Sequence, residues 1–222
     1  MKTSIKIISL FIISIPILYC HTEGHKHGSA NHHMHKRSTE DLIRMFESPE
    51  RTAYQEPDKV LAYIGDLKGK KLMDIGSGSG YFSFRFAKKG ANVVAADVQE
   101  EFLAYVKDRI TKEDVSPGSV TQRKISYTDP FLNDKEMDII FLCNVYHHIE
   151  NRQEYFTKVK KGLSMGGKLV VVDFFKKDLP IGPPMDHKID QETVKSELEK
   201  LGFKNIKLDE KLLKYQYIIT AE

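Results

Sequence analysis

Three glycines stand at alternate positions just after an acidic residue, in the run Asp74-Ile75-Gly76-Ser77-Gly78-Ser79-Gly80. Glycine adopts positive φ at little steric cost and lets a backbone approach a ligand closely. A short apolar segment precedes the run and a helix-like segment follows it, which is where α/β folds bind their ligands. We therefore expect a nucleotide-like ligand on this loop, in contact with Asp74, Gly76, Ser77, Gly78 and Gly80.

The spacing of the loop excludes two common nucleotide sites. A dinucleotide fingerprint needs a third glycine where this chain has Tyr81, and no Gly-Lys-Ser/Thr follows to make a P-loop. A pyrophosphate gains nothing from the Asp74 carboxylate, whereas a ligand with an ammonium or sulfonium group is attracted by it. Asp97 ends the next predicted strand, where a carboxylate accepts hydrogen bonds from ribose hydroxyls. The following Val98 is placed to pack against an adenine face.

These residues resemble the first two motifs of the class I S-adenosylmethionine-dependent methyltransferases. The run Phe141–Ile149 is similar to the fourth-strand motif of that superfamily's methyltransferase-domain branch, and Leu163–Leu169 resembles its Leu-x-Pro-Gly-Gly turn, with Met165 in place of proline. The resemblance covers about Asp41 to Glu222. It implies an enzyme that uses S-adenosyl-L-methionine, with further cofactor contacts from Asp129 and Asn144. For Asp129, a solvated turn before Pro130 is an equal alternative.

The resemblance also implies a doubly wound, Rossmann-like, mostly parallel seven-stranded sheet with an antiparallel strand near the C-terminus. The residues agree, because strand-like and helix-like segments alternate along the chain. The predicted strands are Lys71–Ile75, Asn92–Asp97, Val120–Ile125, Met137–Asn144, Lys168–Phe174, Ile206–Asp209 and Tyr215–Thr220. The predicted helices are Thr39–Glu47, Pro49–Ile64, Gly80–Lys89, Glu100–Thr111, a helix from an Asn151/Glu154 capping box to Leu163, and one that Asp190 caps and Gly202 stops.

The candidate acceptor side follows the fourth predicted strand. Methyl transfer from a sulfonium is an in-line displacement, which depends on alignment and exclusion of water, and it needs a base only if the acceptor arrives protonated. Tyr146, His147 and His148 are the candidate catalytic residues, with histidine as the base. Alternatively, one histidine only orients the loop. Further candidates for lining an acceptor pocket are Tyr54, Gln55, Asp173, Asp186 and His187.

Residues 1–20 differ from the rest of the chain. Lys2 and Lys6 precede an uncharged stretch, Ile7–Tyr19, that is too short for a membrane span and typical of a signal peptide. It ends at Cys20, which resembles the lipidated cysteine of bacterial lipoproteins, although Tyr19 departs from the small residue expected there. We expect a signal peptide or lipoprotein signal and a membrane-tethered or exported protein. Tethering on the cytosolic side is the alternative.

Residues 21–38 form a polar, histidine-rich linker ahead of a domain at 39–222. Disorder is one interpretation, and loose transition-metal binding is another, through His25, His27, His32, His33 and His35. Without Lys2 and Lys6 the chain has 32 basic and 31 acidic side chains. This balance favours a small-molecule acceptor over nucleic acid.

A second function class stays open beside the methyltransferase. A protein behind an export signal could keep the fold without catalysis, as a membrane-tethered surface or metal-binding lipoprotein. The narrower similarity of Pro49-Glu50-Arg51, Tyr146-His147-His148 and Gly182-Pro183-Pro184 is to exported bacterial methyltransferase-like proteins of unassigned substrate. An NAD-dependent enzyme is disfavoured by Tyr81.

Overall fold

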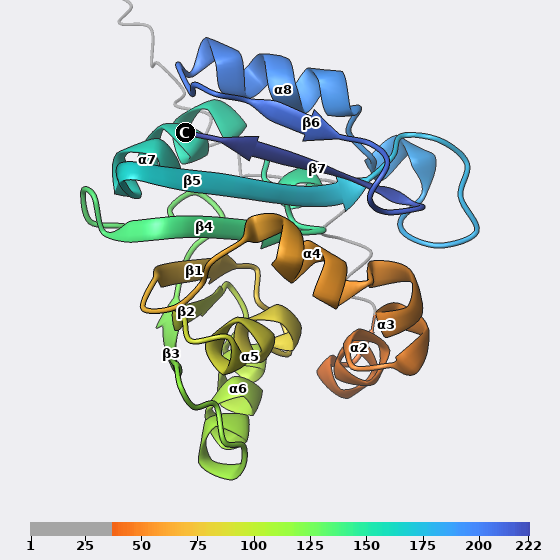
Figure 1. Cartoon of the computed structure of the whole chain (residues 1–222). Helices are drawn as coiled ribbons and strands as arrows, with labels where there is room; N and C mark the ends of the chain where they lie inside the picture. Colours follow the sequence, from red (N-terminus) through yellow and green to blue (C-terminus); the bar gives the residue numbers. More distant parts are fainter. Residues whose placement is uncertain (1–36) are drawn as a thin grey trace, which may run out of the picture.

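Seven strands form one sheet in a computed structural model that describes residues 37–222 (Figure 1). Their order across the sheet is β3-β2-β1-β4-β5-β7-β6, and all neighbours run parallel except β7, which is antiparallel to β5 and β6. The predicted mostly parallel sheet with an antiparallel strand near the C-terminus is therefore confirmed. The strands are β1 (Lys71–Ile75), β2 (Asn92–Asp97), β3 (Ser119–Lys124), β4 (Met137–Cys143), β5 (Leu163–Phe174), β6 (Lys207–Asp209) and β7 (Gln216–Ala221).

The helices pack on the two faces of this sheet. Adjacent residues of one strand enter different hydrophobic clusters, as Leu72 and Met73 of β1 do, because successive side chains of a strand point to opposite faces. One cluster includes side chains of α4 and α5, and the other includes side chains of α7 and α8. The helices are α2 (Thr39–Phe46), α3 (Pro49–Gln55), α4 (Pro57–Ile64), α5 (Tyr81–Lys88), α6 (Glu100–Lys112), α7 (Arg152–Gly162) and α8 (Gln191–Lys200), with short 3₁₀ turns η1 (Tyr146–His148) and η2 (Met185–His187).

The helix predicted over Pro49–Ile64 is wrong as a single element. It divides at Glu56, whose φ of 44° is left-handed, into α3 and α4. Pro57 explains the break, because a proline disfavours helical backbone in the residue before it and has no N–H to continue the helix. The break turns α3 toward the carboxyl edge of the sheet, where Gln55 becomes fully buried.

Two other local predictions are corrected. Asn151 does not cap the backbone of α7; its side chain donates to the Glu154 carboxylate at 2.9 Å instead. Strand β5 begins at Leu163 rather than Lys168, because the Gly166-Gly167 turn lies within an irregularity of the β4–β5 pairing. Asp190 does cap α8, as predicted, by accepting a hydrogen bond from the Glu192 N–H.

The predicted leader at 1–20 and the five candidate metal-binding histidines, His25, His27, His32, His33 and His35, lie outside the described residues. The domain boundary at 39 also stays a prediction, although the first described helix begins there. Between residues 37 and 222 no helix has the length and apolarity needed to cross a membrane.

Candidate cofactor and acceptor site

The candidate residues meet at one edge of the sheet, where β1, β2, β4 and β5 end. Parallel strands place their carboxyl ends together, so the glycine loop after β1, Asp97 at the end of β2 and Asn144 after β4 become neighbours. Strand β7 runs the other way and begins there, with Gln216 paired to Phe174.

The glycine loop has the backbone that its residues predict. Gly76, Gly78 and Gly80 have φ values of 69°, 53° and 80°, which side chains rarely tolerate. The N–H groups of Gly76 and Ser77 both donate to the Ala96 carbonyl of β2, at 2.8 and 3.0 Å. A Cβ on Gly76 would collide with Val145, so this glycine also lets the loops after β1 and β4 approach closely.

Asp97 is bonded directly to that loop. Its Oδ2 accepts a hydrogen bond from the Gly78 N–H at 2.8 Å, and its Oδ1 accepts one from the Gln99 N–H at 2.9 Å. Burial raises the pKa of this carboxyl, while the backbone N–H groups oppose the rise. A carboxylate has about four acceptor positions, so two bonds leave room for a ligand. The adjacent Val98 is partly buried and packs against a core cluster.

Asp74 lies beneath the loop. It is 3% exposed, and the Ser83 hydroxyl at the start of α5 donates to it at 2.6 Å. Burial raises the pKa of Asp74 to about 7, and the nearby Arg51 charge opposes the rise. The Asp74 carboxylate is therefore bonded to the first turn of α5, and its predicted contact with a cofactor stays a prediction.

Ser77 carries a polar group that this part of the chain leaves unused. Its hydroxyl oxygen is buried and makes no hydrogen bond within residues 37–222. Buried polar atoms normally have a partner, so an unpaired hydroxyl in a glycine loop fits a polar ligand. Together with the free acceptor positions of Asp97, it meets the requirements of a nucleoside cofactor.

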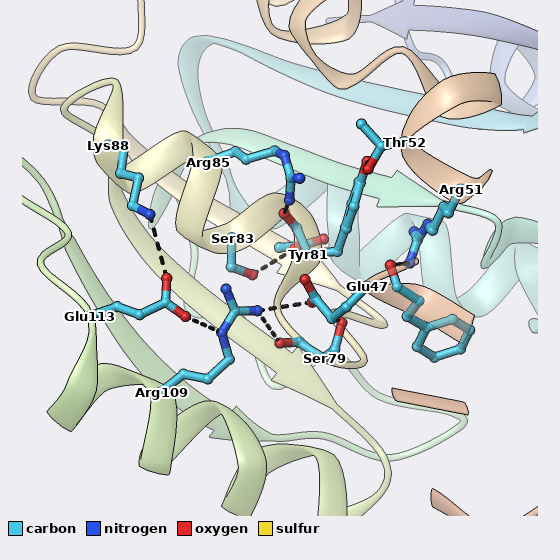
Figure 2. Close-up of polar contacts among 12 residues, drawn as sticks. Glu47, Arg51, Thr52, Ser79, Tyr81, Ser83, Arg85, Lys88, Arg109 and Glu113 are labelled. Atoms are coloured by element: carbon cyan, nitrogen blue, oxygen red, sulfur yellow. Dashed lines mark hydrogen bonds and ion pairs between the residues drawn. The ribbon is translucent and has the colours of Figure 1, made fainter. Parts of the chain in front are cut away.

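Two residues connect α2 and α3 to the glycine loop and its following helix. The first is Glu47, directly after α2, which Figure 2 shows. The Glu47 carboxylate accepts hydrogen bonds from the Ser79 hydroxyl at 2.6 Å and from Arg109 of α6 at 2.9 Å, and Arg109 also donates to the Ser79 carbonyl at 2.8 Å. Arg51 of α3 stacks on the Tyr81 ring, 4.2 Å from its centroid. The sequence hypothesis did not include Glu47 or Arg109, because no local motif links residues 62 positions apart.

His147 and Asp173 form a buried pair on the candidate acceptor side. The His147 Nδ1 lies 2.9 Å from both carboxylate oxygens of Asp173, and the two side chains are 3% and 1% exposed. A carboxylate only accepts, so the neutral histidine places its proton on Nδ1 and keeps Nε2 as the acceptor. His147 therefore has the arrangement of an oriented base.

His148 has a different environment from His147. The two rings are 4.3 Å apart, and burial, followed by the charge that His147 can carry, lowers the pKa of His148 to about 3. A histidine with so low a pKa is a weak base at neutral pH. The geometry thus favours His147 over His148.

Three side-chain amides join the elements around this pair. Gln55 of α3 donates to Gln216 of β7 at 2.7 Å, Gln216 donates to Asn144 at 2.6 Å, and Asn144 donates to Gln55 at 3.4 Å. We call Gln55, Asn144 and Gln216 the amide triangle. Both ends of the Asn144 amide are occupied within it, and the predicted contact of Asn144 with a cofactor stays a prediction.

Two other predicted site residues lie apart from the pair. Tyr146 is fully buried, stacks near Phe156 and donates to Glu197 of α8 at 2.7 Å, and burial raises the pKa of its hydroxyl. Its hydroxyl is thus bonded to α8, and its predicted catalytic role stays a prediction. Asp129 is paired with Lys158 of α7 at 3.0 Å, which fits the solvated-turn alternative.

The remaining lining candidates are spread around the same loops. Tyr54 is half-buried and its ring centroid lies 6.1 Å from that of Phe174. His187 is buried on η2, whereas the neighbouring Asp186 side chain is 77% exposed. No cluster of His, Cys, Asp or Glu within residues 37–222 has the arrangement of a metal site.

Comparison with known proteins agrees with this fold. Residues 73–171 match the family model of the "Methyltransferase domain". A solved "SAM dependent methyltransferase from Aquifex aeolicus" is 24% identical, covers 83% of this chain and 98% of its own, and superposes with a TM-score of 0.73.

Curated relatives match a smaller part of the chain and differ in the reactions for which they are named. The "tRNA U34 carboxymethyltransferase" of Pseudomonas fluorescens (strain SBW25) is 28% identical over 48% of this chain and 33% of its own length. The "Demethylmenaquinone methyltransferase" of Tropheryma whipplei (strain Twist) is 25% identical over 64% of this chain and 62% of its own. The chain thus spans about a third of the first of these relatives. Over residues 73–171 the chain is thus similar to the methyltransferase-domain family, and its fold is that of the solved methyltransferase.

Proposed function

We propose that this protein transfers the methyl group of S-adenosyl-L-methionine to a small-molecule acceptor. The observation that carries the proposal is the bond between Asp97 and the Gly78 N–H, 2.8 Å long. It joins a ribose-type carboxylate to a loop whose glycines permit close approach, and Tyr81 removes the dinucleotide alternative.

Several residues would hold the cofactor. Asp97 offers acceptor positions to ribose hydroxyls together with negative charge, and the Ser77 hydroxyl offers an unused hydrogen bond. When bound, the cofactor supplies an electrophilic methyl group on a sulfonium. The loop between Gly76 and Gly80 keeps that end of the site close to the sheet and away from bulk water.

The acceptor side supports a nucleophile that must lose a proton, such as a hydroxyl. His147 Nε2 is the free acceptor of the buried pair, and Asp173 holds Nδ1 and stabilises the imidazolium once the proton is taken. The amide triangle keeps the loop after β4 in register with α3 and β7. An acceptor that arrives deprotonated would use the same alignment without the base.

A small acceptor is favoured over nucleic acid by charge. The chain carries +3 overall and +1 beyond residue 20, whereas nucleic-acid binding requires an extended basic surface. RNA is the competing acceptor, because one of the relatives is named for the modification of tRNA.

Calorimetry on the full chain tests the cofactor. We expect micromolar affinity, or roughly 7–9 kcal/mol, for S-adenosylmethionine and its demethylated product. Gly78→Arg and Asp97→Ala should abolish binding, whereas Asp134→Ala removes an exposed acid and should leave the affinity unchanged. The absence of both heat and thermal stabilisation with either ligand would overturn the assignment.

The sequence before the domain supports a second proposal, on location. The uncharged stretch Ile7–Tyr19 followed by Cys20 suits a protein tethered to a bacterial membrane, either exported or held on the cytosolic side. Export would favour the non-catalytic lipoprotein function, because the methyl donor is made in the cytosol. Mass spectrometry of the protein from its native membrane separates these cases: a diacylglyceryl group on Cys20 supports export, and unmodified Cys20 in the membrane fraction supports the cytosolic tether.

A further inference from the structure

A hollow of about 410 Å³ lies beside the candidate acceptor side, and its lining is basic. Four of the lining residues are lysines, Lys176, Lys177, Lys211 and Lys214, against two acids, Asp190 and Glu210. None of these lysines forms an ion pair with a residue in the range 37–222. The hollow, which we call the lysine hollow, therefore has two uncompensated positive charges.

Both acids of the lysine hollow are already engaged. Asp190 caps α8 through the Glu192 N–H at 3.0 Å, and Glu210 accepts a hydrogen bond from Gln191 at 2.7 Å. The first backbone N–H groups of α8 lie at the same place, and a helix N-terminus carries partial positive charge. The charges around the hollow thus favour an anion.

The buried Lys188 contacts the backbone of one of the lining residues. Lys188 is 3% exposed, and its ammonium group donates to the Lys177 carbonyl at 3.0 Å. On the facing side, the Phe175 N–H donates to the Tyr215 carbonyl at 3.1 Å, which holds the segment after β5 beside the start of β7. The lysine hollow is therefore framed by fixed backbone, although its four lysine side chains are exposed.

The lysine hollow is lined by residues that are close in sequence to the candidate acceptor site. Lys176 follows Asp173 by three residues and Lys214 precedes Gln216 by two, so the Cα atoms of Asp173 and Lys176 are at most about 11 Å apart. This is the length of a small metabolite. A nucleophile at His147 and an anionic end in the hollow can belong to one molecule.

We propose that the lysine hollow binds the phosphate group of a phosphomonoester acceptor. That the ligand is a methyl acceptor rests on the proposed function. That phosphate binds in the lysine hollow rests on the residues of the hollow alone. Lysine ammonium groups suit a phosphate as point charges, and an excess of two positive charges matches a dianion. The hollow is confined to one end of the β6–β7 hairpin, which favours a small phosphate ester over the extended backbone of RNA.

Titration of the full chain with inorganic phosphate, against chloride at equal ionic strength, tests the site. We expect saturable binding that Lys211→Gln/Lys214→Gln weakens about tenfold, with shifted amide signals of Lys176, Lys177 and Gln191. The matched control, Lys204→Gln/Lys207→Gln, removes two exposed lysines near and in β6 and should change the affinity less than twofold. Equal weakening by both variants, or no saturation, would overturn the proposal.

Two further arms separate the alternatives. A single-stranded RNA oligomer that binds more tightly than inorganic phosphate, and loses that affinity in Lys211→Gln/Lys214→Gln, would replace the phosphomonoester by RNA and overturn the proposal. Binding of the demethylated cofactor is measured in the same samples. Its absence would overturn the proposed methyl transfer and leave the phosphate result intact, so the two failures are distinguishable.

Discussion

The Ser79 hydroxyl donates a hydrogen bond of 2.6 Å to the Glu47 carboxylate, which joins the end of α2 to the glycine loop. The same Glu47 oxygen accepts from Arg109 of α6, so three elements distant in sequence share one carboxylate. The loop after β1 is thus positioned from both sides, by Ala96 and Asp97 of β2 and by Glu47.

Replacing Glu47 by glutamine should release α2 from the loop. The amide keeps the size but loses the charge that Arg109 requires, at a cost of about 1–2 kcal/mol. We expect faster amide hydrogen exchange over Thr39–Phe46 and several-fold weaker binding of the demethylated cofactor. Glu50→Gln removes an exposed acid of α3 and serves as the control. Unchanged exchange in Glu47→Gln would show that the contact does not hold the helix.

Replacing Asp74 by asparagine should change the pH dependence of stability. Burial raises the pKa of Asp74 to about 7 from 3.8, so the folded state holds a proton that the unfolded state has lost. Stability from this group is complete below about pH 4 and is lost as the pH rises to about 7, by at most about 1.4 kcal/mol per pH unit. Relative to the wild type, Asp74→Asn should therefore gain stability across that window in urea unfolding. Asp58→Asn, on the exposed face of α4, should give no such gain.

His148 should affect stability in the opposite direction. Its pKa is lowered to about 3 from 6.5. Between these pH values His148 is therefore protonated in the unfolded state and neutral in the folded state. The wild type then loses stability as the pH falls from about 6.5 toward 3, again by at most about 1.4 kcal/mol per pH unit. In His148→Gln this part of the acid sensitivity should disappear from urea unfolding curves. Parallel curves for the two proteins between these pH values would contradict the burial of an uncharged His148.

Asp173 should fix the tautomer of His147. Nitrogen-detected NMR of the wild type should place the neutral proton on Nδ1, where Asp173 accepts it. Asp173→Asn should give a tautomer mixture, leave the affinity for the demethylated cofactor within twofold, and slow transfer to a hydroxyl acceptor by about 10²–10⁴-fold, the usual contribution of a base. The control is Asp186→Asn, which changes an exposed aspartate beside His187. A wild-type proton on Nε2 would remove the assigned role.

The cofactor half of the site was predictable from sequence because it is local. Asp74, the three glycines and Asp97 lie within 24 consecutive residues, and both β1 and β2 have their predicted bounds. Alternation of apolar segments also predicted the sheet. Even the error at Glu56 has a local cause, Pro57, which an inspection of that single residue could have identified.

The acceptor half depends on contacts that sequence patterns do not contain. Asp173 and His147 are 26 residues apart, and Gln55 and Gln216 are 161 apart. Tyr146 has the same local context as His147, yet the 3₁₀ turn η1 points its ring into the core and its hydroxyl to Glu197. Which side of a short turn a residue faces is decided by packing, and no spacing rule gives it.

The contacts of the amide triangle can form only later in synthesis than those of the glycine loop. Gln55 and Gln216 are separated by 161 residues, so at roughly 5–20 residues per second a ribosome delivers the second roughly 8–32 s after the first. The glycine loop and Asp97 can meet early in that interval, whereas the bonds of Gln55 and Asn144 to Gln216 must wait for β7. We therefore expect the contact between the glycine loop and Asp97 to form before the amide triangle, which is completed only when β7 enters the sheet.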